Sequence, residues 1–160
     1  MTKGEIILNK YLVFWIKEEF AYYYFYKNDI LHRFLSSYQN DKDRWDLSIQ
    51  YDYITNRVPV NKLISHLYKN HNHSVQAQNN KKIFEIYNYQ QYLTLHIHEK
   101  HLTFHCESLD DAEELLFPIL RIFQPLLFVM SETNQGEYGW ISPVTKNRKY
   151  NSGQTLYSYH

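Results

Sequence analysis

The hydrophobic pattern begins with a run that has the length and composition of a buried strand. Residues Tyr11–Ile16 read YLVFWI, an unbroken apolar run rich in aromatic and β-branched side chains. A short run of this kind is typical of a strand that is covered on both faces. Residues 17–38 then follow a helical spacing that is interrupted at Asn28-Asp29. We therefore expect two helices, with Asp29 as the N-cap of the second.

Two further helices are predicted before the middle of the chain. The first should end near Thr55, because a residue that precedes a proline, as Val58 does here, disfavours helix; its apolar positions are Trp45, Ile49, Tyr53 and Ile54. The second has a helical stripe that consists of Leu63, Ile64, Leu67 and Tyr68. Residues 70–80 read NHNHSVQAQNN and carry no periodicity, so we predict a loop there.

The second half of the chain is dominated by strand patterns. Residues 83–87 form one candidate strand, and residues 92–106 alternate on both sides of Glu99-Lys100, which predicts a hairpin. In that register one face of the hairpin carries Leu95, Ile97, Leu102, Phe104 and Cys106. A helix over 108–123 should bend at Pro118 and stop at Pro125. Strands over 126–130 and 138–141 should then pair through a turn at 133–136.

This order of elements predicts the fold class. A strand, a block of helices and then hairpins indicate an α+β domain with a mainly antiparallel sheet, helices packed on it and an aromatic-rich core. We expect one domain over residues 1–144 and a flexible C-terminal tail over 145–160, where the composition becomes polar and basic.

Composition narrows the class of function. The chain has 160 residues, with 17 basic and 17 acidic side chains, and this balance argues against direct nucleic-acid binding. Cys106 is the single cysteine, which excludes an internal disulfide and a CxxC motif. The chain shows no apolar run that could span a membrane, no signal-peptide pattern and no phosphate-binding or hydrolase motif. We therefore expect a cytoplasmic protein without a membrane anchor. The missing motifs also make a small-molecule substrate, a cofactor and catalytic activity less expected.

One histidine cluster offers a different class of function. The hairpin register that turns the apolar side chains inward turns His96, His98, His101 and His105 outward together, with His98 opposite His101. Three or four such ligands could hold Zn²⁺. The alternative is that histidine fills the polar half of a half-exposed hairpin, and the metal-binding protein remains a rival hypothesis.

The first helix has rings on more than one side. Its segment 17–26 reads KEEFAYYYFY, which places Ala21 and Phe25 on one face and Phe20 and Tyr24 on a neighbouring stripe that Tyr23 widens. The Phe20–Tyr24 stripe either serves a large aromatic core or faces outward as a protein-binding hot spot. The outward arrangement requires the helix to break at Asn28-Asp29.

Three ordered motifs resemble a known family. These are IKEEF…YF within Ile16–Phe25, QxxYIT in Gln50–Thr55 followed by Pro59, and YGWxxPV in Tyr138–Val144. Over roughly residues 11–144 the chain resembles the sporulation inhibitor of replication, SirA. The resemblance implies a small, non-catalytic bacterial regulator that binds the N-terminal domain (domain I) of the replication initiator DnaA and blocks initiation at the chromosome origin during sporulation.

The resemblance also implies site residues. The aromatic pair of the family's binding surface falls on Phe20 and Tyr24, and a glutamine of that surface falls on Gln50. With the neighbouring Tyr23, these residues are our expected partner-binding site, and the helix break at Asn28-Asp29 is the arrangement that suits it.

Overall fold

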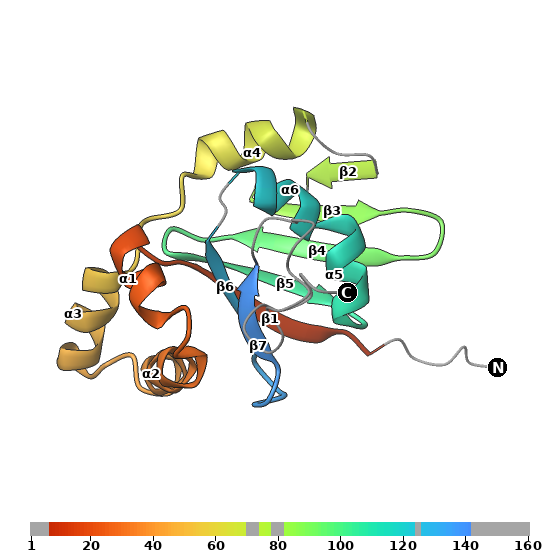
Figure 1. Cartoon of the computed structure of the whole chain (residues 1–160). Coiled ribbons are helices and arrows are strands. Elements are labelled where there is room, and N and C mark those ends of the chain that lie inside the picture. The colour runs from red at the N-terminus through yellow and green to blue at the C-terminus, as the bar shows by residue number, and fades with distance from the viewer. Residues whose placement is uncertain (1–6, 70–73, 78–81, 124–125, 142–160) are drawn as a thin grey trace.

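A single seven-stranded sheet organises the protein. The computed structural model describes residues 7–69, 74–77, 82–123 and 126–141, and Figure 1 shows helices on both sides of the sheet. Neighbouring strands are antiparallel, in the order β2-β3-β4-β5-β1-β6-β7. The strands are β1 (Asn9–Trp15), β2 (Ser74–Ala77), β3 (Ile83–Tyr87), β4 (Tyr92–Ile97), β5 (His101–Cys106), β6 (Leu127–Ser131) and β7 (Tyr138–Ile141).

Six helices lie in the described part of the chain. They are α1 (Glu18–Tyr24), α2 (Asn28–Asn40), α3 (Trp45–Ile54), α4 (Val60–Lys69), α5 (Leu109–Leu115) and α6 (Phe117–Phe123). The predicted α+β class with an antiparallel sheet is confirmed. The predicted tail, 145–160, lies outside the described residues.

Strand β1 divides the interior into two cores. Tyr11, Val13 and Trp15 face the core that α4, α5 and α6 cover, which we call the α4–α6 core. Leu12 and Phe14 point the other way, into a core under α1, α2 and α3, which we call the α1–α3 core. Because both faces of β1 are buried, every one of its central residues is apolar, as the continuous run predicted.

The predicted β4–β5 hairpin is confirmed with its register. Leu95 pairs with Phe104, Ile97 pairs with Leu102, and these side chains are buried in the α4–α6 core. The alternation of the sequence therefore determined both the pairing and the buried face.

Two predictions in the middle of the chain are wrong. The predicted loop over 70–80 contains β2, which pairs antiparallel with β3, Val75 lying opposite Ile86. β2 is an edge strand with mostly exposed side chains, so it needs no alternating pattern to form.

The predicted N-cap of the second helix, Asp29, is also different in the structure. α2 begins at Asn28, and Asp29 lies inside its first turn, where it pairs with Arg33.

The predicted single helix over 108–123 is two helices. α5 ends at Leu115 and α6 begins at Phe117, so the break falls just before Pro118. Proline lacks a backbone N–H and clashes with the carbonyl four residues earlier, but it fits the first turn of a helix. Pro118 therefore belongs to the start of a new helix, whereas we predicted a bend within one. Pro125 lies outside the described residues.

Candidate protein-binding surface

The first helix is short and is held in place by its neighbours. Ala21 is fully buried against the α1–α3 core, and the backbone N–H of Lys17 donates to the Ile54 carbonyl across 2.9 Å. Ile16 also forms a β-bridge with Thr55, which follows α3. A seven-residue helix is not stable alone, so these contacts place α1 beside the end of α3.

The aromatic pair of α1 lies half in and half out of the core. Phe20 and Tyr24 are both partly buried and pack against the α1–α3 core. Neither of the two predicted arrangements, full burial or an outward stripe, describes them alone. The helix break that the outward arrangement required is present, since α1 ends at Tyr24 and α2 begins at Asn28.

A part-buried hydrogen bond joins β7 to the first residue after that break. The indole N–H of Trp140 donates to Oδ1 of Asn28 across 2.8 Å. Trp140 lies on β7 and is fully buried in the α1–α3 core. The start of α2 is therefore set by a residue that lies more than a hundred positions further along the chain.

Exposed rings surround the half-buried pair. The Tyr23 and Tyr24 rings meet edge to face, with centroids 4.9 Å apart, and the Lys27 ammonium lies 4.1 Å above the Tyr23 ring. Burial, together with the neighbouring Tyr23 hydroxyl, raises the pKa of Tyr24 above its ordinary value. The phenol therefore stays protonated at neutral pH and can donate a hydrogen bond.

Helix α3 supplies the other half of the surface. The Tyr53 ring meets the Phe20 ring edge to face, with centroids 5.2 Å apart, and the Lys17 ammonium lies 5.5 Å above it. Gln50 is exposed and lies three residues before Tyr53, so the two side chains are neighbours on the helix surface. We call Phe20, Tyr23, Tyr24, Gln50 and Tyr53 the aromatic surface.

Tyr53 is the member of this surface that sequence analysis did not assign. It stands in the YIT part of the motif, and its spacing from Gln50 was visible. In the sequence, Tyr53 counted only as one of the apolar positions that predict the helix. No sequence signal shows that this side of α3 faces solvent, while Tyr51 and Ile54 are buried.

The histidine cluster is arranged as a stack of rings. The predicted opposition of His98 and His101 is confirmed, and their rings lie parallel with centroids 4.5 Å apart. The His96 and His98 rings are 4.0 Å apart, and His98 Nε2 lies 3.1 Å from the Thr103 hydroxyl. His105 is partly buried on the same face of β5.

The prediction that the four histidines face fully outward is wrong. His96, His98 and His105 are half-buried, and the His101 ring stacks on Phe14 of the α1–α3 core, 5.9 Å away. Burial lowers the pKa of His98 to about 4 and that of His101 to about 3. Within the described ranges, no group of three or more His, Cys, Asp or Glu side chains is placed to hold a metal ion. The geometry thus gives the metal-binding hypothesis no support.

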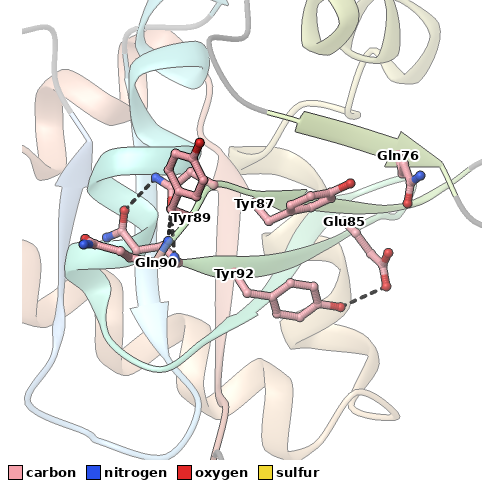
Figure 2. Close-up of a pocket in the computed structure, with 8 residues that line it drawn as sticks. Gln76, Glu85, Tyr87, Tyr89, Gln90 and Tyr92 are labelled. Atoms are coloured by element: carbon pink, nitrogen blue, oxygen red, sulfur yellow. Dashed lines mark hydrogen bonds between the residues drawn. The ribbon is translucent and has the colours of Figure 1, made fainter.

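Two further features were considered as possible chemical sites, the Cys106 thiol and a hollow on the protein surface. Burial raises the pKa of the Cys106 thiol to about 12, which keeps it protonated. An open hollow of about 460 Å³ lies at the β3–β4 turn. Figure 2 shows Tyr92 among its lining residues, directed toward Glu85. The Tyr92 hydroxyl donates to Glu85 across 3.0 Å, and burial together with this carboxylate raises the pKa of Tyr92, so the phenol stays protonated. In the part of the chain that is described, no helix is long and apolar enough to cross a membrane.

Comparison with known proteins agrees with the motifs. Residues 9–145 match the model of the family described as sporulation inhibitor of replication protein SirA. The chain is also similar to a curated protein of Bacillus subtilis (strain 168) named sporulation inhibitor of replication protein SirA. The two are 25% identical over 149 residues, which cover 88% of this chain and 97% of the relative. Because the family match spans most of the chain and includes all three motifs, the protein belongs to the SirA family, a family of regulatory inhibitors of replication and not a known enzyme family.

Proposed function

We propose that this protein inhibits initiation of DNA replication by binding the N-terminal domain (domain I) of the initiator DnaA through its aromatic surface. Phe20 and Tyr24 are the anchors of the contact, Tyr23 and Tyr53 widen it, and Gln50 supplies directional hydrogen bonds. Inhibition then needs no chemistry, because an occupied N-terminal domain is blocked from the assembly contacts that DnaA makes there.

The observation that carries this proposal is the half-buried state of Phe20 and Tyr24. Phe20 packs against the α1–α3 core and the Tyr53 ring, and Tyr24 packs against that core and the Tyr23 ring. Both rings remain partly exposed. A ring held in this way loses little conformational entropy on binding, so most of its newly buried area contributes to affinity. Aromatic rings with a polar rim are the usual composition of a binding hot spot.

The charge balance supports a protein partner. The 17 basic and 17 acidic residues leave no net positive charge to attract phosphate groups. We therefore expect no shift of origin DNA by the protein alone, even at low salt.

The proposal is tested by calorimetric titration of the protein into the isolated N-terminal domain of DnaA from the same organism. We expect 1:1 binding, and a loss of about 2 kcal/mol or more for Phe20→Ala and for Tyr24→Ala. Gln50→Ala should lose about 1 kcal/mol, since it removes hydrogen bonds and little area.

Tyr22→Ala is the matched control. Tyr22 is exposed on the same helix, about 200° around from Phe20, and its hydroxyl bonds within the helix to Glu18 across 3.4 Å. Circular dichroism and thermal melting should show that each variant is folded. If wild-type protein does not bind, the partner is wrong; if it binds and the Phe20, Tyr24 and Gln50 variants match Tyr22→Ala, the surface is wrong.

A further inference from the structure

Helix α3 is apolar on two opposite sides, and only one of them is covered by the protein. Tyr51 and Ile54 are buried in the α1–α3 core. On the other side Trp45, Ile49 and Tyr53 are 73%, 58% and 61% exposed. A helix that is apolar on all sides is normally buried, so the second side of α3 lacks the cover that its composition calls for.

The three exposed side chains form a row, which we call the α3 stripe. Their four-residue spacing places them on successive turns, and eight residues of helix extend over about 12 Å. Single exposed apolar residues are ordinary on protein surfaces, but a contiguous row of large ones marks an interaction site.

Polar groups border the far end of the stripe. The Arg44 guanidinium and the Asp46 carboxylate, on either side of Trp45 in the sequence, pair through two bonds of 3.1 and 2.6 Å. Each partner raises the charged fraction of the other, since the pKa of Arg44 rises and that of Asp46 falls. An aromatic centre with a polar, neutralised border is the usual arrangement in a protein–protein contact.

The near end of the stripe is continuous with the aromatic surface. The Tyr53 ring contacts Phe20 of α1, and Gln50 lies three residues before Tyr53 on the helix surface. A partner that covers Phe20 and Gln50 therefore already covers one end of the stripe. The same partner needs to extend by only two helical turns to reach Trp45.

We propose that Trp45 and Ile49 form a second contact region for the same partner, so that the N-terminal domain of DnaA covers α3 along its length. This inference rests on the proposed function. The DnaA domain would present to the stripe an apolar strip about 12 Å long, with Trp45 as its far anchor.

The test is a titration of the N-terminal domain of DnaA with Trp45→Ala and Ile49→Ala. Trp45→Ala should weaken affinity about tenfold or more, and Ile49→Ala about fivefold. Ile122→Ala is the matched control for Ile49→Ala, because Ile122 is 68% exposed on α6, on the opposite face of the sheet. It should bind within about twofold of wild type, and Phe20→Ala provides the reference for the proposed anchor.

The possible outcomes separate this inference from the proposed function. If wild type binds and Phe20→Ala weakens binding while Trp45→Ala and Ile49→Ala match Ile122→Ala, the proposed function stands and the second region is rejected. If wild type does not bind, both are rejected. If wild type forms a dimer in sedimentation experiments that Trp45→Ala abolishes without change in DnaA binding, the stripe is covered by a second copy and the inference is overturned.

Discussion

The two faces of the sheet are covered by hydrophobic cores of different composition. On one face α4, α5 and α6 cover a core built mostly from Leu, Ile, Val and Ala. On the other, α1, α2 and α3 cover a core in which aromatic rings take a larger share, since Phe14, Tyr51, Phe128 and Trp140 are buried and further rings pack against them partly buried. Figure 1 shows the three helices of this second face gathered at one end of the sheet.

The difference continues to the protein surface. Of the large apolar side chains that are exposed in the described ranges, seven belong to residues 18–54 and two to α4–α6. The seven are Tyr22, Tyr23, Tyr26, Ile30, Trp45, Ile49 and Tyr53, and the two are Tyr68 and Ile122. The α4–α6 helices bury most of their large apolar side chains within the chain, whereas the helices of the α1–α3 face leave several large ones exposed. Under the function proposed above, the ring-rich α1–α3 core would hold these exposed side chains in place for a partner.

The largest expected effect comes from removing the ring that joins the sheet to α2. Trp140→Ala deletes a fully buried indole and removes the hydrogen bond that its N–H donates to Asn28. We expect a loss of about 3–5 kcal/mol in the free energy of unfolding. Urea denaturation followed by circular dichroism measures it.

Phe117→Ala is the matching variant in the α4–α6 core, on the opposite face of the sheet from Trp140. Phe117 is fully buried in the α4–α6 core, so its loss should also be about 3–5 kcal/mol. The folded fraction of Phe117→Ala should bind the partner as wild type does. The folded fraction of Trp140→Ala should bind more weakly, because α1 and α2 lose their contacts with the Trp140 indole. Equal binding by the two variants would contradict the division of roles between the faces.

A smaller effect on the free energy of unfolding is expected from protonation of the stacked His98 and His101 rings. Burial lowers the pKa of His98 to about 4 and of His101 to about 3, and each neighbouring imidazole, Lys10 and Lys42 add to the shift. An unfolded histidine takes up its proton near pH 6.5. Between the folded and unfolded pKa values the unfolded state binds more protons than the folded state. The free energy of unfolding therefore keeps the full contribution of the neutral histidines above pH 6.5 and decreases as the pH drops toward 4.

Thermal or urea unfolding at pH 7, 6 and 5 measures this dependence. After allowance for solvent screening, the slope should be on the order of 1 kcal/mol per pH unit for each histidine. The double variant His98→Gln/His101→Phe should show a flatter profile, because Phe keeps the stack on Phe14 without titrating. An unchanged slope would assign the pH dependence to other groups.

The smallest effect should come from Tyr51→Phe. The Tyr51 hydroxyl donates to the Lys100 carbonyl across 3.0 Å and ties α3 to the β4–β5 turn, while its ring stacks on Tyr38. The variant keeps the ring and loses one hydrogen bond, so we expect a loss of about 1 kcal/mol in the free energy of unfolding. Tyr53→Phe, whose hydroxyl is on the exposed side of the helix, is the control and should be neutral within about 0.5 kcal/mol. A loss as small as the control's would mean that the bond is replaced by water.

Much of the fold could be predicted because local patterns and tertiary contacts agree. The run Tyr11–Ile16 predicted a strand that is buried on both faces, and the alternation around Glu99-Lys100 predicted the β4–β5 register. Both signals are strong, because the side chains that must be buried are already apolar and correctly spaced. The edge strand β2 lacked such a signal, since its mostly exposed side chains are free to vary.

The sequence named most of the candidate site residues, but it did not show how deeply each one is buried. Motifs indicated Phe20, Tyr24 and Gln50, yet the half-burial of the two rings depends on how closely α1 approaches the sheet. The histidines show the same limit: alternation placed them on one face, but it did not show that Phe14 lies against one of them.

By itself, the sequence determined the fold class, the buried strand β1, the hairpin register and the family. Only the tertiary structure decided which side of α3 is buried, where α2 starts and that Tyr53 joins Phe20 to Gln50. The physical reason is that periodicity orients side chains relative to their own helix or strand. Which neighbour covers them depends on contacts between residues far apart in the chain, such as Trp140 with Asn28.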